Sequence, residues 1–99
     1  MHALFIKHHA KPGRRDELEA AWRQHMMPAI ADNDGHICYI YSYGAEPDTI
    51  GAFQVYTSKQ AADAFIRAPA YLAYLADSRP LLAHDPEVTI LEPRWTKGG

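Results

Sequence analysis

The sequence has a single cysteine, no long apolar run and no excess of charge of one sign, and each shortage excludes a class of protein. Cys38 alone cannot build a disulfide framework or a multi-cysteine metal site. No apolar stretch approaches the roughly 20 residues that a membrane-spanning helix needs. Ten Lys and Arg against twelve Asp and Glu give a formal net charge of −2, which provides no electrostatic attraction for nucleic acid or an anionic membrane.

The composition is that of one small folded domain. The chain has 99 residues, of which 47% are hydrophobic and 22% are charged, proportions typical of a globular protein. We expect a single domain over residues 1–99, with an ordered core over about 1–93 and a tail over 94–99. The N-terminus lacks the basic region, apolar stretch and cleavage site of a signal peptide, so a cytoplasmic protein is expected.

Hydrophobic periodicity predicts the elements and their order. Leu18, Trp22, Met26 and Ile30 recur every four residues, which is typical of one buried helix face. Pro28 is expected to kink or end that helix early. Ser58 and Thr57 are alternative N-caps for a second helix. Strands are predicted over 2–9, 36–43, 49–56 and 87–92, and helices over 14–30, 58–67 and, after Pro69, 70–76.

The order β-α-β-β-α-β predicts an α+β, ferredoxin-like fold: a four-stranded antiparallel sheet with helices on one face. Two helices cover only one face of such a sheet. Yet Phe5, Ile40 and the ladder of Tyr39, Tyr41 and Tyr43 place large side chains on both faces. A second copy packed sheet to sheet would cover the other face. We therefore expect a homodimer.

Four short motifs, taken in order, carry a resemblance to a known family. They are Lys11-Pro12-Gly13-Arg14, Gly35-x-x-x-Tyr39, Phe53-Gln54-Val55-Tyr56-Thr57-Ser58 leading into Ala61, and Pro69 with Tyr71 at the helix break. Over almost its whole length the chain resembles the antibiotic biosynthesis monooxygenase family, whose members pair into a dimeric α/β barrel. That family includes cofactor-independent oxygenases of polycyclic aromatic phenols and quinols, and a haem-degrading branch.

Two departures from the family pattern bear on chemistry. The position of Gln54 is commonly Glu in the family, and that of Phe65 is commonly His. A Glu–His pair can hold a proton, whereas Gln and Phe offer no group that titrates near neutral pH. The haem-degrading branch also needs a histidine on the second helix, and residues 59–76 contain none. Haem degradation is therefore not expected.

His8 is the candidate acid–base group, with a buried structural histidine as the alternative. It shares strand parity with Leu4 and Ile6 and is expected to face the helices near Phe65. No metal is expected, because consecutive His8 and His9 point to opposite faces and cannot chelate one ion. Cys38 is expected to be a small buried hydrophobe.

The aromatic residues are candidates either for the core and dimer seam or for a flat aromatic ligand. No Gly-x-Gly-x-x-Gly, phosphate-binding loop or nucleophile motif is present, so no cofactor is expected. The candidate substrate-binding residues are Trp22, Tyr39, Tyr41, Gln54, Tyr56, Phe65 and Tyr71.

Three hypotheses about function remain open at the level of the sequence. The first is a cofactor-independent monooxygenase, because a phenolate or hydroquinone anion can pass an electron directly to O₂ if the protein binds it, deprotonates it and excludes water. The second is a non-catalytic small-molecule-binding or stress-related module of the same fold, which Gln54 and Phe65 favour. The third is a purely structural dimer with a filled core.

Overall fold

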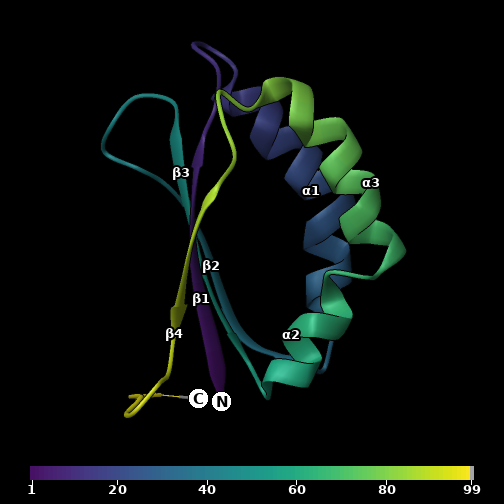
Figure 1. Cartoon of the computed structure of the whole chain (residues 1–99), viewed down its shortest axis with the longest axis vertical. Coiled ribbons are helices and arrows are strands. Elements are labelled where there is room, and N and C mark those ends of the chain that lie inside the picture. The colour runs from purple at the N-terminus through teal and green to yellow at the C-terminus, as the bar shows by residue number, and fades with distance from the viewer. Residues whose placement is uncertain (99) are drawn as a thin grey trace.

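The computed structural model describes residues 1–98 as one layer of helices over one face of a sheet (Figure 1). The strands lie in the order β2-β3-β1-β4, and every neighbouring pair is antiparallel. This confirms the predicted α+β, ferredoxin-like fold. The elements are β1 (His2–His9), α1 (Arg15–Ala31), β2 (His36–Tyr43), β3 (Thr49–Tyr56), α2 (Lys59–Phe65), α3 (Pro69–Ser78), the 3₁₀ turn η1 (Arg79–Leu81) and β4 (Glu87–Leu91).

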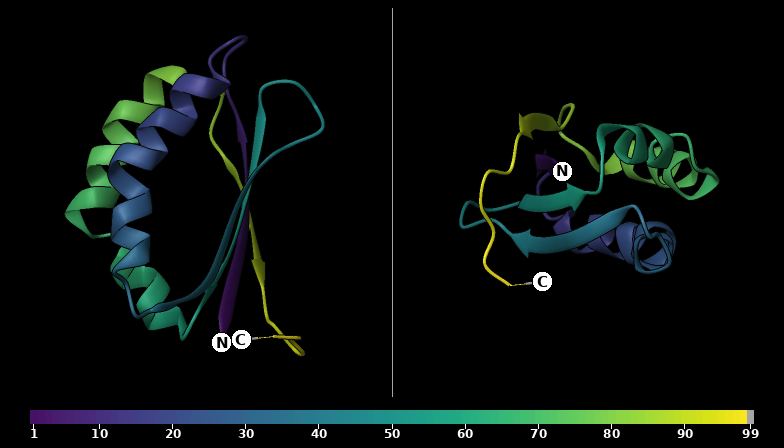
Figure 2. Two further views of the ribbon diagram at one scale, coloured as in Figure 1. Left: turned by 180° about the vertical axis from the view of Figure 1, so that it is seen from behind. Right: turned by 90° about the horizontal axis from the view of Figure 1, so that it is seen from below.

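The helices lie on one face of the sheet because their apolar stripes point that way. Leu18, Trp22 and Met26 on α1 are buried, and both long helices stay on the same side in views from behind and from below (Figure 2). Helix α2 begins after Ser58, whose side chain accepts a hydrogen bond from the Ala61 N–H at 3.1 Å. Ser58, rather than Thr57, is therefore the N-cap. No helix within residues 1–98 is long and apolar enough to cross a membrane.

Helix α1 continues through Pro28 to Ala31, so of the two outcomes expected for Pro28, a kink or an early end, the early end is wrong. The ring of Pro28 is exposed, and its missing N–H removes one hydrogen bond from the ladder. The turn is completed by the Asp32 N–H, which donates to the Pro28 carbonyl at 3.2 Å. Packing of Met26 and Ile30 against the core offsets the lost bond, because these side chains lie on the face toward the sheet.

A β-bulge at the start of β2 changes which face two residues occupy. His36 pairs with Tyr56 and Cys38 with Val55, so Ile37 is the extra residue. The bulge turns His36 toward the helices. Strict alternation along the strand would instead place His36 on the outer face. Its ring centroid lies 4.3 Å from that of Tyr56. Cys38 is exposed on the outer face, so the expectation of a buried thiol is also wrong.

The outer face of the sheet carries large apolar side chains in contact with solvent. Phe5, Ile40 and Leu91 are 38%, 54% and 41% exposed. After β4 the chain crosses part of this face near the N-terminus (Figure 2), and Trp95 on that segment is 80% exposed. Both faces of the sheet therefore carry apolar residues, as the sequence predicts, and the homodimer stays a prediction.

Candidate functional site

A cavity of about 300 Å³ lies between the sheet and the helices. Helices α1 and α3 and the turn η1 border it on one side, and strands β1, β3 and β4 border it on the other. Val88 faces the same side of the sheet as Ile6, its partner in the register, yet it remains exposed. With Ile66 and Arg79, both exposed, Val88 lines the mouth of the cavity. The volume is at the lower end of the range for small-molecule sites.

Gln54 forms one end of the cavity. It is 3% exposed and projects from the centre of β3. Its side-chain oxygen Oε1 accepts a hydrogen bond from the Tyr56 hydroxyl at 2.6 Å, and the His36 Nε2 atom lies 3.4 Å from the same oxygen. Phe65 packs edge-on against the His36 ring at a centroid distance of 4.7 Å. This end is therefore a neutral amide enclosed by aromatic rings.

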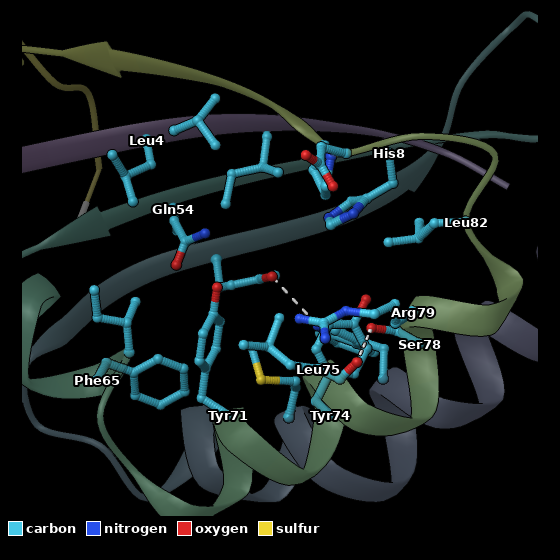
Figure 3. Close-up of a pocket in the computed structure, with 18 of the residues that line it drawn as sticks. Leu4, His8, Gln54, Phe65, Tyr71, Tyr74, Leu75, Ser78, Arg79 and Leu82 are labelled. Atoms are coloured by element: carbon cyan, nitrogen blue, oxygen red, sulfur yellow. Dashed lines mark hydrogen bonds between the residues drawn. The ribbon is translucent and has the colours of Figure 1, made fainter.

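The walls of the cavity are aromatic and held by specific contacts. The Trp22 indole N–H donates to the Tyr39 hydroxyl at 3.2 Å, and the ring of Tyr41 stacks on Trp22 at 4.1 Å on its other side. Tyr71 packs edge-on against Phe65 at 6.3 Å. In Figure 3, Tyr71 rises from α3 toward Gln54. Such rings offer flat apolar surface together with hydroxyl groups at their edges.

The cavity disfavours charge on the groups that line it. Desolvation raises the pKa of Tyr39 to about 12, and it also raises the pKa values of Tyr56, Tyr71 and Tyr74. These phenols remain protonated at neutral pH and can act as hydrogen-bond donors. Burial acts in the opposite sense on imidazole and lowers the pKa of His36.

His8 forms the other end of the cavity. Its Nδ1 atom is buried and has no hydrogen-bond partner among residues 1–98. Desolvation, with a smaller contribution from neighbouring His9, lowers the pKa of His8 to about 4. His8 faces the helices, as the sequence predicts, but it lies at the opposite end of the cavity from Phe65 (Figure 3). The predicted proximity of these two side chains is therefore wrong.

The sequence matches the family described as antibiotic biosynthesis monooxygenase over residues 1–77. The chain belongs to that family. No curated protein matches this sequence, whereas many solved structures match the fold.

Several solved structures fit almost the whole chain. A Mycobacterium tuberculosis protein is 27% identical with a TM-score of 0.87, and the match covers 98% of each chain. A Chloroflexus aurantiacus protein, provisionally named an antibiotic biosynthesis monooxygenase, is 26% identical with a TM-score of 0.84, covering 98% of this chain and 96% of that one. A Nitrosomonas europaea protein with the same provisional name is 16% identical with a TM-score of 0.88, and the match covers 96% of this chain and 100% of that one. At this identity the likeness shows only a shared fold.

This family member brings most of the residues singled out from its sequence into one cavity. Tyr41 is the exception, because it lies behind Trp22 and lines a shallow surface groove beside Tyr43 and Glu19. Those that line the cavity are His8, Trp22, Tyr39, Gln54, Tyr56, Phe65 and Tyr71.

Sequence reasoning missed other residues of the site. Tyr74 and Ser78 lie three and seven residues after Tyr71, a helical spacing that places them on the same face of α3. That spacing could have found them. Arg79 enters the cavity through η1, which follows α3 directly. His36 reaches Gln54 because of the bulge at Ile37, for which the sequence gives no signal.

Proposed function

We propose that this protein oxidises a flat aromatic phenol, quinol or related ketone with O₂, without a metal or organic cofactor. The unpartnered Nδ1 of His8 at the end of an aromatic-lined cavity carries the proposal. A buried polar atom without a partner is costly unless a ligand satisfies it. Membership of the antibiotic biosynthesis monooxygenase family supports the same reaction class.

The reaction needs a proton acceptor and an aromatic-lined cavity that excludes water. In this scheme His8 takes a proton from the substrate, and the resulting anion passes one electron to O₂. The substrate radical and superoxide then combine into a peroxide anion, which takes the proton back from His8 to become a hydroperoxide. Elimination of water leaves one oxygen atom on the ring as a carbonyl, so that a CH₂ group becomes C=O and one H₂O is released per O₂ consumed. Trp22, Tyr39 and Tyr71 would hold the ring system and exclude water.

The low pKa of His8 limits how the proton can move. At neutral pH the imidazole is uncharged and free to accept a proton. Its conjugate acid is nevertheless strong, so proton transfer is favourable only where other groups stabilise the substrate anion. Arg79, at the mouth of the cavity, is one such group, and Gln54 is a second.

A non-catalytic binding module of the same fold is the second candidate. The observation that favours it is the Gln54 end, where a hydrogen-bonded amide and Phe65 stand in place of a titrating pair. Under this hypothesis aromatic ligands bind in the same cavity and no oxygen is consumed.

We also propose that the protein acts as a homodimer through the outer face of its sheet. Exposed Phe5, Ile40 and Leu91 support this assembly, because an open apolar face of this kind favours a partner of the same chemistry. The proposed partner is a second copy of this chain.

Oxygen uptake tests the oxygenase against the binding module. The purified protein would be incubated with chelator, without flavin, and with anthrone or a reduced naphthoquinol. We expect saturable oxygen uptake above the rate of autoxidation, and a large loss of uptake in His8→Ala. Uptake at the autoxidation rate, together with an increase in melting temperature on ligand binding, would favour the binding module. Full turnover by His8→Ala would remove the assignment of His8.

A further inference from the structure

A backbone amide determines which groups donate and which accept hydrogen bonds at the Gln54 end of the cavity. The Gly35 N–H lies 3.2 Å from the Asn33 Oδ1 atom. A backbone N–H can only donate, so this contact fixes the oxygen of the Asn33 side chain toward Gly35. The nitrogen Nδ2 must then face the other way, where it lies 2.8 Å from the Nδ1 atom of His36.

The orientation of Asn33 determines the tautomer of His36. Because Asn33 Nδ2 donates, His36 Nδ1 accepts and carries no proton in the neutral ring. The proton is therefore on Nε2, which faces the Gln54 Oε1 atom at 3.4 Å. Burial lowers the pKa of His36 and keeps the ring neutral at pH 7.

The Gln54 amide is fixed by these donors. Its oxygen accepts from the Tyr56 hydroxyl at 2.6 Å and faces the His36 N–H. Its nitrogen has no hydrogen-bond partner in the part of the chain that the structure describes. In Figure 3 the oxygen of Gln54 turns toward Phe65 and the nitrogen turns toward the His8 end. The free N–H groups therefore point along the cavity.

We propose that Asn33 and His36 hold the Gln54 amide with its N–H groups in the cavity, and that this end binds the carbonyl oxygen of an aromatic ketone. The proposal rests on the proposed function for its reaction and on the hydrogen-bond geometry for its ligand. The hydroxyls of Tyr39 and Tyr71, which remain protonated at neutral pH, line the same cavity and can also donate to that oxygen.

The placement of Gln54 and His8 matches a ketone that loses its proton on the far side of the ring. Gln54 pairs with Leu4, and His8 lies four residues further along β1, about 13 Å by the rise of a strand. In the proposed complex the carbonyl group points to Gln54, and the acidic CH₂ group across the same ring points to His8. When His8 takes the proton, the electron pair moves through the conjugated rings to the ketone oxygen, which becomes an enolate oxygen.

This arrangement explains why glutamine suits the site better than glutamate. A carboxylate at residue 54 would face the enolate oxygen with a like charge. The Gln54 N–H groups instead donate to that oxygen as its charge develops, which stabilises the anion at this end of the cavity. Gln54 is thus a substrate-binding residue, and Asn33 and His36 are positioning residues that act through it.

The tautomer of His36 can be measured in the ligand-free protein. Nitrogen-15 NMR of the histidine side chains distinguishes a protonated ring nitrogen from an unprotonated one. We expect His36 to carry its proton on Nε2. A proton on Nδ1 would overturn the proposed positioning of Gln54 by Asn33 and His36. The Nε2 atom of His36 would then accept a hydrogen bond from Gln54, and the amide orientation would be reversed.

The ligand class can be tested with 9-fluorenone, which has a carbonyl group but can neither enolise nor be oxygenated. We expect it to bind about 3- to 10-fold more tightly to the wild type than to Gln54→Leu, as one hydrogen bond allows. The carbonyl stretching frequency of bound fluorenone should be lower in the wild type than in Gln54→Leu. Absence of saturable binding to the wild type, or an equal frequency in the two proteins, would refute the proposal.

The positioning role of His36 is tested by the carbonyl frequency of bound fluorenone, because a general loss of stability would not change that frequency. His36→Phe should shift the fluorenone frequency toward that of Gln54→Leu, whereas His36→Gln, which keeps an N–H donor, should restore the wild-type frequency. His25→Phe is the matched control, because His25 bonds Asp77 outside the cavity. A wild-type frequency in His36→Phe would show that His36 does not position the amide.

These results are separable from the oxygenase hypothesis. Fluorenone binding with a lowered carbonyl frequency, but no oxygen uptake with anthrone, would support the ketone site and reject catalysis. Oxygen uptake with unaltered fluorenone in every variant would support catalysis and reject the ketone site.

Discussion

The burial of His8 predicts a specific dependence of stability on pH. Its pKa is about 4 in the folded protein, against 6.5 for the exposed side chain. Between these values the unfolded chain binds a proton that the folded protein does not. Acid therefore favours unfolding: the contribution of neutral His8 is present above pH 6.5, declines as the pH falls below it, and levels off below about 4.

The magnitude follows from the difference between the two pKa values. Lowering the pH from about 7.5 to about 5 should reduce the free energy of unfolding by about 2 kcal/mol through His8 alone. His36 acts in the same direction because its pKa is also lowered. Arg79, His84 and Asp85 line the same end of the cavity as His8, so a single-site comparison is needed to isolate the imidazole.

The assay is urea unfolding followed by tryptophan fluorescence at both pH values and one protein concentration. His8→Gln keeps a polar side chain of similar size and does not titrate, so its loss of stability should be about 2 kcal/mol smaller than that of the wild type. His84→Gln is the control, because that side chain is exposed. An equal pH dependence in the wild type and His8→Gln would show that the burial of His8 does not make the folded protein less stable in acid.

Three further predictions concern packing, the site and assembly. Gly35→Ala should cost about 1–3 kcal/mol of stability, because a Cβ there would lie 3.0 Å from the Ala61 Cβ. Urea unfolding measures this loss. If Ala61→Gly did not restore the stability of Gly35→Ala, the steric cause would be contradicted. Tyr56→Phe should cost about 1 kcal/mol by removing the 2.6 Å bond to Gln54, so an unchanged unfolding midpoint would argue against that bond. Ile40→Lys should give a monomer in analytical ultracentrifugation, since Ile40 is exposed on the outer face; a dimer of unchanged affinity would exclude this face as the interface.

The sequence predicts the fold well because its periodicity is strong where the elements are buried. The stripe of Leu18, Trp22 and Met26 fixes the inner face of α1. The alternation along β1 places Leu4 and His8 on the helix side of the sheet, as observed. These signals are local, and burial of one face reinforces each of them.

The errors arise where one residue interrupts a regular pattern. Pro28 near the end of α1 is tolerated because its ring faces solvent, a fact that depends on how the helix docks. Ile37 is accommodated as a bulge, which reverses the face of His36 and creates its contact with Gln54. Cys38 is exposed because no helix covers the outer face of the sheet within residues 1–98 (Figure 2).

The cavity itself could not be derived from the sequence. The aromatic residues are equally compatible with a filled core, and whether space remains between the helices and the sheet depends on how the helices are placed above the strands. The low pKa of His8 and the fixed tautomer of His36 depend on burial and on contacts between distant residues. Such properties emerge only from the tertiary arrangement.

The most direct test of cofactor-free oxygenation is the fate of labelled oxygen. Purified, chelator-treated protein would convert anthrone under ¹⁸O₂, and the product and the consumed oxygen would be quantified against the rate of autoxidation. We predict a protein-dependent rate at which each product molecule gains one ¹⁸O atom, one O₂ is consumed and hydrogen peroxide does not accumulate. Product formation no faster than autoxidation, or release of all the labelled oxygen as hydrogen peroxide, would contradict it.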